Sequence, residues 1–184
     1  TFDGDLFTRD ESGWQAVKIP GRHYGARMLC VLPDGVRLVL RLGEPIRSEL
    51  WTIEGSTVTR QEQVAGSAEC VAVSPDGRWL AVGGEPIELV DLSTPGAERQ
   101  FVGYHESVQA MDFSPDGRTL ATIGRSSRAR LWNVPTRSEL FDIDASTARL
   151  YALDFAPDGT ALAVGGERRL EGMTALGIYR VLTR

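Results

Sequence analysis

The sequence predicts an all-β fold built from repeated units of about forty residues, each containing four short strands. A Pro-Asp-Gly turn recurs four times, and its prolines lie 42, 40 and 42 residues apart. Each proline is followed five residues later by a leucine and preceded, at two and four residues, by large apolar residues. No long segment has the apolar period of a helix. A fixed period in this range indicates a repeat architecture in which each unit packs on its neighbours.

The first two strands of each unit are expected to form a hairpin around the Pro-Asp-Gly turn. Proline presets φ, aspartate hydrogen-bonds to the nearby backbone, and glycine accepts a positive φ. Apolar residues two apart indicate strands with one strongly buried face. The turns are Pro33-Asp34-Gly35, Pro75-Asp76-Gly77, Pro115-Asp116-Gly117 and Pro157-Asp158-Gly159. The residues expected to be buried are Leu38, Leu80, Leu120 and Leu162 after the turns, and Leu29, Val31, Val71, Val73, Met111, Phe113, Leu153 and Phe155 before them.

The third repeat predicts the remaining strands most clearly. Its second strand covers residues 120–124, and a polar turn follows at residues 125–128. A third strand is expected over residues 129–134 and a fourth over residues 138–143. Four short antiparallel strands in about forty residues are typical of one blade of a β-propeller. The fold class is therefore a β-propeller of four-stranded antiparallel blades, of which this chain covers about four.

The residues of this third repeat also resemble a WD repeat. They are Gly103-Tyr104-His105, Phe113-Ser114-Pro115-Asp116-Gly117, Leu120-Ala121-Thr122 and Leu131-Trp132-Asn133. The consensus of that family runs from a Gly-His pair through F-S-P-D-G to a Trp-Asp pair. The second and fourth repeats are similar but eroded, and the first is the most divergent. The resemblance covers roughly residues 21 to 181 and implies the propeller fold, but it names no ligand, because scaffold residues define this family.

The resemblance implies a buried hydrogen-bond network of His105, Thr122 and Trp132. Ser126 stands where the family has an aspartate in this network. His23 occupies the place of His105 in the first repeat, but Leu40 replaces the hydroxyl residue there. We therefore expect His105 to be structural rather than catalytic or a metal ligand. The same holds for His23, with a surface contact as the alternative.

The phase of the repeats predicts five parts of the chain. They are residues 1–20, the outer strands of a preceding blade; 21–64, 65–102 and 103–144, one blade each; and 145–184, a last blade that lacks its outer strand. By resemblance, such propellers have about seven blades and close with an N-terminal outer strand. We interpret the chain as the C-terminal portion of a larger propeller. A complete four-bladed ring is the alternative, although it leaves one N-terminal strand in surplus.

The composition excludes little but directs the search for function. The 184 residues carry a net charge of −5, which argues against nucleic acid as the main partner, since that binding depends on clustered cations. The sequence has no glycine-rich phosphate loop, nucleophile elbow or clustered Cys/His set. We therefore expect no catalytic residue, no cofactor and no metal site. Asp142 and Asp144 are interpreted as solvent-facing strand residues rather than as an acid/base pair.

Cysteine usage and basic composition bear on the compartment and the source. Cys30 and Cys70 lie on inner strands of successive repeats and are expected to be reduced core residues rather than a disulfide. No apolar run approaches transmembrane length, so no membrane partner is expected. Lys18 is the only lysine among 20 basic residues, which indicates coding in a GC-rich genome. We predict a bacterial, cytoplasmic protein.

A partner-binding rim is expected where loops gather at one face of the propeller. Tyrosine and arginine are the residue types that contribute most binding energy at protein interfaces. Two simpler interpretations stay open: the tyrosines cap the core between blades, and the arginines belong to solvated loops and strand ends. The candidate rim residues are Tyr24, Arg27, Tyr104, Glu106, Arg125, Arg128, Tyr151, Arg168 and Arg169.

These observations predict a non-catalytic protein-interaction or sensing propeller domain that docks a partner or regulates an attached effector. The expected partners are another protein, or the remaining propeller half and an effector domain. The alternative is a propeller domain accessory to a peptidase, or one belonging to a periplasmic Tol-type protein, because Ser-Pro-Asp-Gly turns occur there too.

Overall fold

The computed structural model describes the chain apart from residues 1–4, 11–12, 19–27, 43–46, 55–56, 66–67, 95, 97–98, 104–106, 127, 145–147, 169–173 and 181–184. The chain forms two compact units, Thr1–Ala68 and Glu69–Arg184. All regular structure in the described residues is β, in seventeen strands whose pairings are all antiparallel. The predicted fold class is confirmed.

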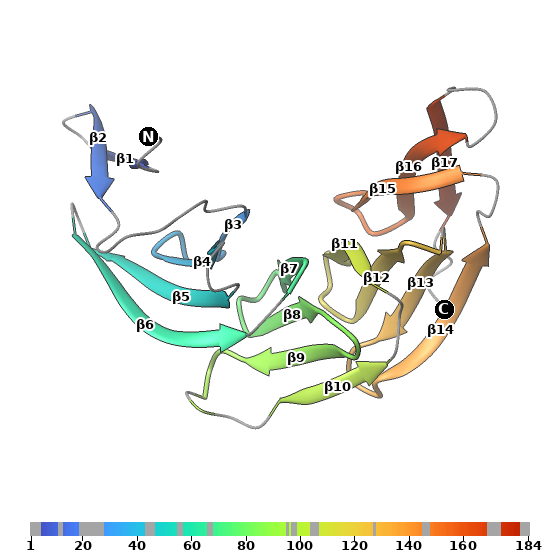
Figure 1. Cartoon of the computed structure of the whole chain (residues 1–184), viewed down its shortest axis with the longest axis horizontal. Coiled ribbons are helices and arrows are strands. Elements are labelled where there is room, and N and C mark those ends of the chain that lie inside the picture. Colours follow the sequence, from blue (N-terminus) through green and yellow to red (C-terminus); the bar gives the residue numbers. More distant parts are fainter. Residues whose placement is uncertain are drawn as a thin grey trace. The chain divides into compact units, whose positions relative to one another are not determined.

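The first unit contains two sheets, seen at the blue end of the colour scale in Figure 1. One is the hairpin of β1 (Asp5–Asp10) and β2 (Gly13–Lys18). The other has four strands in chain order, so each strand pairs with the next along the sequence. These are β3 (Met28–Val31), β4 (Arg37–Leu42), β5 (Arg47–Glu54) and β6 (Thr57–Ala65).

The second unit contains two four-stranded sheets and one three-stranded sheet, each again in chain order. The first is formed by β7 (Cys70–Val73), β8 (Trp79–Gly83), β9 (Ile87–Asp91) and β10 (Gln100–Gly103). The second has β11 (Val108–Phe113), β12 (Thr119–Gly124), β13 (Arg128–Asn133) and β14 (Ser138–Asp144). The third has β15 (Ala148–Phe155), β16 (Ala161–Arg168) and β17 (Thr174–Arg180).

The sheets of the second unit pack on one another through their first strands. β11 contacts β7 on one side and β15 on the other (Figure 1). A hydrogen bond reinforces the second contact, because the backbone N–H of Phe155 donates to Oδ2 of Asp112 at 3.0 Å. Stacking of successive sheets by their first strands is the packing expected of propeller blades.

The four Pro-Asp-Gly turns have the predicted conformation. Their glycines, Gly35, Gly77, Gly117 and Gly159, have φ of 71°, 70°, 69° and 71°. In each turn an aspartate oxygen accepts the backbone N–H two residues ahead, at 3.0 Å. Two turns add a serine hydroxyl that donates to the aspartate, from Ser74 and from Ser114. The local chemistry of these residues therefore fixes the hairpins.

The leucine five residues after each turn's proline is a core residue of its sheet. Leu38, Leu80, Leu120 and Leu162 are all 0% exposed, as predicted. Each lies on the second strand of its sheet, and Leu162 packs in one cluster with Ala121 and Ile123 of the preceding sheet. This apolar face of the second unit is thus buried between two neighbouring blades, whereas Leu38 clusters with Leu40, Trp51 and Val58 of its own sheet. Each fully buried leucine contributes about 1.5–3 kcal/mol.

Val31 departs from the predicted burial. Phe113 and Phe155, which occupy the same place in later repeats, are buried, whereas Val31 is 52% exposed. The physical reason lies in the neighbouring sheet. β11 and β15 each pack on the first strand of the preceding sheet, whereas β3 makes its extensive contacts, among the described strands, with β4. Val31 therefore has no comparable preceding sheet over it.

The division of the chain into blades at the predicted boundaries stays a prediction. Each sheet nevertheless lies within one predicted range, apart from Ala65 at the end of β6 and Gly103 at the end of β10. The two cysteines are thiols rather than a disulfide; Cys70 is buried, whereas Cys30 is half-buried and not the core residue that we expected. The Cys70 thiol donates to the backbone carbonyl of Val108 on the neighbouring sheet at 3.4 Å.

Candidate functional site

Two of the three residues of the predicted network are joined by a hydrogen bond. The indole N–H of Trp132 donates to Oγ1 of Thr122 at 2.9 Å, and both residues are buried. The Trp132 ring packs flat against Gly103 of the preceding sheet, where an added Cβ would overlap the ring. His105 lies outside the described residues. The bond and the ring contact make this cluster part of the junction between two blades.

The predicted rim is described only in part. Tyr24, Arg27, Tyr104, Glu106 and Arg169 lie outside the described residues, as does His23. Arg168 ends β16, and its backbone alone is described. The structure therefore places three rim candidates: Arg125, Arg128 and Tyr151.

Arg128 is engaged by carboxylates of its own sheet. Its Nε lies 2.9 Å and 3.0 Å from the two oxygens of Asp142, and its Nη1 lies 3.5 Å from Asp144. The hydrogen bond from Arg128 lowers the pKa of the Asp142 carboxyl. Arg130 shares the same carboxylate at 3.3 Å. Asp142 is therefore a half-buried ion-pair partner rather than the simple solvent-facing residue that we expected, and a carboxylate of a partner would have to displace it from Arg128.

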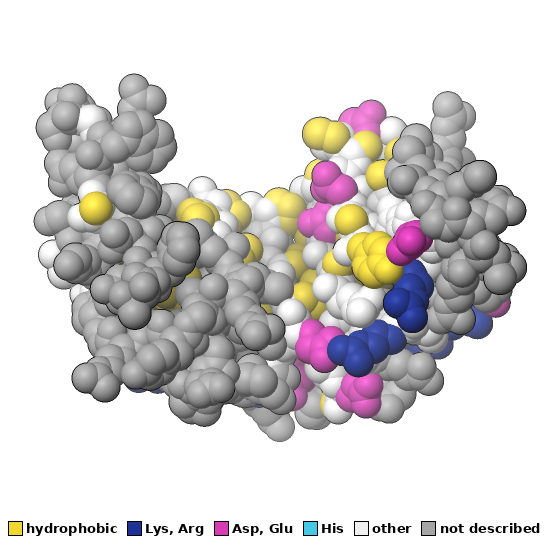
Figure 2. All heavy atoms as spheres, turned by 45° about the horizontal axis from the view of Figure 1, so that its top comes forward, with side chains coloured by type: hydrophobic (Ala, Val, Ile, Leu, Met, Phe, Trp, Pro, Cys, Tyr) yellow, Lys and Arg dark blue, Asp and Glu magenta, His cyan; other side chains and the backbone are white. Residues whose placement is uncertain are grey.

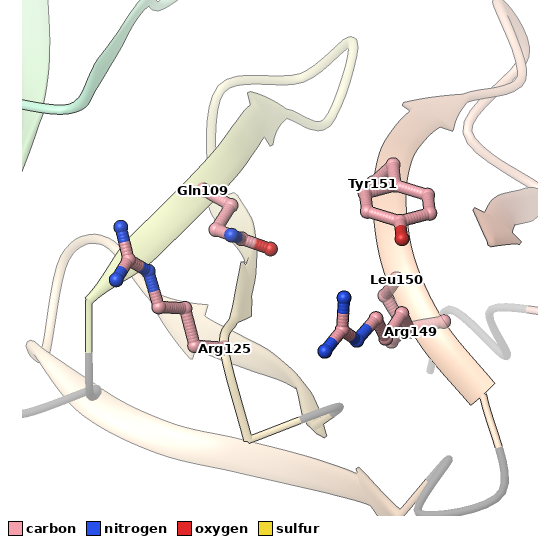
Figure 3. Close-up of a pocket in the computed structure, with 5 residues that line it drawn as sticks. All are labelled: Gln109, Arg125, Arg149, Leu150 and Tyr151. Atoms are coloured by element: carbon pink, nitrogen blue, oxygen red, sulfur yellow. The ribbon is translucent and has the colours of Figure 1, made fainter. Parts of the chain in front are cut away.

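Arg125 and Tyr151 instead line a common cavity of about 320 Å³. Among the described residues, Gln109, Arg149 and Leu150 also line it (Figure 3). Gln109 lies on β11, Arg125 directly follows β12, and the other three lie on β15. The cavity thus lies between two adjacent sheets of the second unit. We call it the bulge cavity, because two of its lining residues lie at β-bulges.

Two of these side chains stand at irregularities of the inner strands. The pairing of β11 with β12 shifts register between Val108 and Ala110, at Gln109. The pairing of β15 with β16 shifts between Leu150 and Ala152, at Tyr151. A β-bulge places an extra residue on one strand and re-aims its side chain. Gln109, near the start of β11, and Tyr151, within β15, are consequently exposed.

A glycine opposite the second bulge allows the close strand approach. Gly166 pairs with Leu150, and a Cβ at position 166 would overlap the backbone carbonyl of Arg149. Any side chain at this position would push β16 away from β15. Gly166 therefore helps to hold Arg149, Leu150 and Tyr151 where they line the bulge cavity.

The polar groups around the bulge cavity differ in how fully they are engaged. Arg125 lies 3.4 Å from Oε1 of Glu69, and the Tyr151 hydroxyl lies 3.4 Å from Oε2 of Glu167. Glu69 also accepts a hydrogen bond from the hydroxyl of Ser107 at 3.0 Å. Within the described part of the chain, the side chains of Arg149 and Gln109 form no hydrogen bond or ion pair. Figure 3 shows both pointing into the space between β11 and β15.

Gln109 and Arg149 were not among the rim residues predicted from the sequence. A signal existed, because Glu69, Gln109 and Tyr151 each stand six residues before a turn proline. All three are exposed, and two of them line the bulge cavity. The period of the turns could therefore have pointed to these positions.

The described residues offer donors and acceptors rather than reactive groups. Among them, no three His, Cys, Asp or Glu side chains lie together in a way that could hold a metal ion. None of the described segments is a helix long and apolar enough to cross a membrane. The chemistry available at the bulge cavity is hydrogen bonding, ion pairing and aromatic contact.

Comparison with known proteins identifies the class and then the family. Sheets of four short antiparallel strands that stack by their first strands are blades of a propeller. The family model described as "WD domain, G-beta repeat" matches residues 50–85 and 97–133. The chain belongs to the WD40-repeat family, so the predicted resemblance is confirmed.

Three curated relatives show the extent of the similarity. The transcription factor unc-37 of Caenorhabditis elegans is 26% identical over 151 residues, 80% of this chain and 24% of the relative. Protein groucho of Drosophila melanogaster is 30% identical over 146 residues, which are 77% of this chain and 20% of the relative. The U3 small nucleolar RNA-associated protein 15 homolog of Xenopus tropicalis is 31% identical over 83 residues, which are 44% of this chain and 16% of the relative. The chain spans about a quarter or less of the length of these relatives.

A solved structure shows the same fold at low identity. The hydrazine synthase of Kuenenia stuttgartiensis superposes with a TM-score of 0.70 and 19% identity, covering 88% of this chain and 49% of that one. At this identity the likeness concerns the fold alone.

Proposed function

We propose that this chain is a protein-interaction domain without catalysis of its own, and that a protein partner docks over the bulge cavity. WD40 repeats supply a scaffold on which binding residues sit in loops and at strand ends. The bulge cavity is such a place, since its described residues come from two blades, at the bulges of their first strands and in the turn after β12.

One observation carries this proposal. The side chains of Gln109 and Arg149 point into one shared space beside the exposed Tyr151. Neither side chain forms a hydrogen bond or an ion pair with another described residue. Tyrosine and arginine are enriched among residues that contribute most binding energy at interfaces. A cavity lined mainly by polar groups suits a polypeptide better than an apolar small molecule, whose pockets are lined chiefly by hydrophobic residues.

The distribution of charge favours a protein over nucleic acid. Figure 2 shows acidic and basic side chains side by side on the right-hand part of the molecule, interspersed with apolar ones. Nucleic acid binding requires clustered cations that neutralise phosphates. Glu69 and Glu167 stand beside Arg125 and Tyr151, and they would repel such phosphates.

Capture of partners by the intact protein tests the proposal. The bait would be the wild type, a variant with Tyr151→Ala and Arg125→Ala, and Arg137→Ala, which removes an exposed arginine from the turn between β13 and β14. We expect at least one partner to be lost about tenfold or more with the double variant, as for interface hot spots, and to be retained with Arg137→Ala. If the double variant captures every partner as well as the wild type does, docking over the bulge cavity is wrong.

The whole protein's role goes beyond this domain. Regulation of an attached effector, a bacterial source and a cytoplasmic location stay predictions. No observation on the described residues favours the alternative of a peptidase-accessory or Tol-type propeller.

A further inference from the structure

We propose that the bulge cavity binds the carboxylate of one glutamate or aspartate side chain, in an extended acidic segment of the partner. This inference rests on the proposed function, since it names the chemistry that the docking surface recognises. Arg149 is the residue that would carry the recognition. It lies on β15, two residues before the bulge residue Tyr151.

Among the described residues around the bulge cavity, one arginine faces a glutamate and the other forms no ion pair, although Glu167 lies opposite it in the register of β15 and β16. Arg125 already faces Glu69 at 3.4 Å. Arg149, in contrast, has no ion pair or hydrogen bond with any residue that the structure describes. A guanidinium presents parallel N–H donors that match the two oxygens of a carboxylate, in a bidentate pair that gives direction as well as attraction. Arg149, which has no ion pair within the described part of the chain, can therefore pair with one monoanionic carboxylate.

The same charges disfavour a phosphorylated ligand. A phosphate monoester carries about −1.5 to −2 charges near neutral pH, so a single guanidinium does not neutralise it. The remaining charge would lie close to Glu69 and Glu167, which flank the bulge cavity through their contacts with Arg125 and Tyr151. Like charges at such short range repel. Of the two anions, the carboxylate fits the surroundings better.

The other lining residues suit the peptide that carries this carboxylate. The Gln109 amide offers both donors and an acceptor, which is the pattern that a peptide backbone can satisfy. Tyr151 is 52% exposed and offers an aromatic face beside them. The volume of about 320 Å³ is at the low end for small-molecule pockets, roughly 300–1,000 Å³, and Leu150 is the one aliphatic residue among the described lining residues. The site therefore has room for an inserted side chain.

Degenerate peptide libraries test the inference directly. Nine-residue peptides with random flanks and a fixed central Glu, Gln or phosphoserine would be passed over the immobilised full chain, and the retained fraction measured. We expect Glu-centred peptides to be retained about tenfold over Gln-centred ones, which corresponds to about 1.4 kcal/mol. Arg149→Gln should abolish this preference, Arg149→Lys should keep part of it, and Arg137→Gln, the charge-matched control, should leave it unchanged. Circular dichroism verifies that each variant is folded.

The outcomes separate this inference from the proposed function. Equal retention of Glu- and Gln-centred peptides, lost on Tyr151→Ala, overturns the carboxylate inference and leaves docking at the bulge cavity intact. Stronger retention of phosphoserine peptides also overturns it. Retention that no cavity variant changes contradicts both proposals. Failure to retain any library contradicts the carboxylate inference, while partner capture by the intact protein still tests the proposed function.

Discussion

Trp132 donates its indole N–H to the hydroxyl of Thr122, across the neighbouring strands β12 and β13. Thr122 is 0% exposed and Trp132 is 3% exposed. Water therefore cannot replace either partner, and a buried donor without an acceptor costs the full desolvation of that group. In the first repeat Leu40 occupies the place of Thr122, so this hydroxyl is a feature of the third repeat.

The hydroxyl of Thr122 should stabilise the fold measurably. Thr122→Val keeps the shape of the side chain but removes the acceptor, and we expect a loss of about 1–3 kcal/mol in the free energy of unfolding. Thr122→Ser retains the hydroxyl and should lose less. Urea denaturation followed by tryptophan fluorescence measures both values. Equal stability of the valine variant and the wild type would contradict the role assigned to this bond.

Gly103 should tolerate no side chain. A methyl group at this position would overlap the Trp132 ring, which packs across the junction between two sheets. Overpacking of this kind costs about 1–3 kcal/mol, so Gly103→Ala should lower the unfolding free energy by that amount. Gly165→Ala is the matched control, because its added Cβ meets nothing within 4 Å. In thermal denaturation, Gly103→Ala should lower the midpoint temperature much more than Gly165→Ala does.

Asp112 should make the protein less stable as the pH rises from the acid range. Burial raises the pKa of its carboxyl above the ordinary 3.8, and the charge of Asp154 adds to this, against the hydrogen bond from the Phe155 N–H. The folded state then binds the proton more tightly than the unfolded one, so stability falls as pH rises through the interval above 3.8. Asp112→Asn keeps an acceptor for Phe155 without the charge.

We therefore expect the unfolding free energy of Asp112→Asn, relative to the wild type, to increase between pH 3.5 and pH 7. Denaturation curves at several pH values measure this difference, in which the titrating groups that do not interact with Asp112 cancel. A difference that stays constant across the range would show that Asp112 does not titrate as described.

The turn carboxylates should act with the opposite sign. The Ser114 hydroxyl, followed by the Arg118 backbone N–H, lowers the pKa of Asp116 below 3.8. Its stabilising contribution is present above that value and is lost as the pH falls through the folded-state pKa. Asp116→Asn should therefore reduce the loss of stability between pH 5 and pH 2. If the variant and the wild type lose stability in parallel over this range, the turn contributes nothing to acid sensitivity.

The parts of the fold that depend on local chemistry were predictable from the sequence. Proline, aspartate and glycine set each turn within three residues, and the leucine that follows is buried in every repeat. Burial of Val31 was predicted wrongly, because its exposure depends on whether a preceding sheet covers β3. Such contacts between sheets cannot be read from the sequence of a single repeat.

The candidate site was predictable only in part for the same reason. Tyr151 and Arg125 stood out by residue type, whereas Gln109 and Arg149 became relevant only when β11 and β15 were seen side by side. The pairing of Arg128 with Asp144 in the register of β13 and β14 likewise follows from sheet geometry. This register lets Arg128 pair with a carboxylate of its own sheet.

Photo-crosslinking tests the central claim, docking over the bulge cavity, most directly. A photoreactive phenylalanine analogue would replace Tyr151 in the intact protein and, as the matched control, Phe141, which is 64% exposed on β14. We predict that position 151 forms an adduct with a protein partner, that Arg149→Gln abolishes it, and that position 141 forms none. Adducts from position 141 alone would contradict docking over the bulge cavity, whereas adducts at 151 that are insensitive to Arg149→Gln would contradict the carboxylate inference alone.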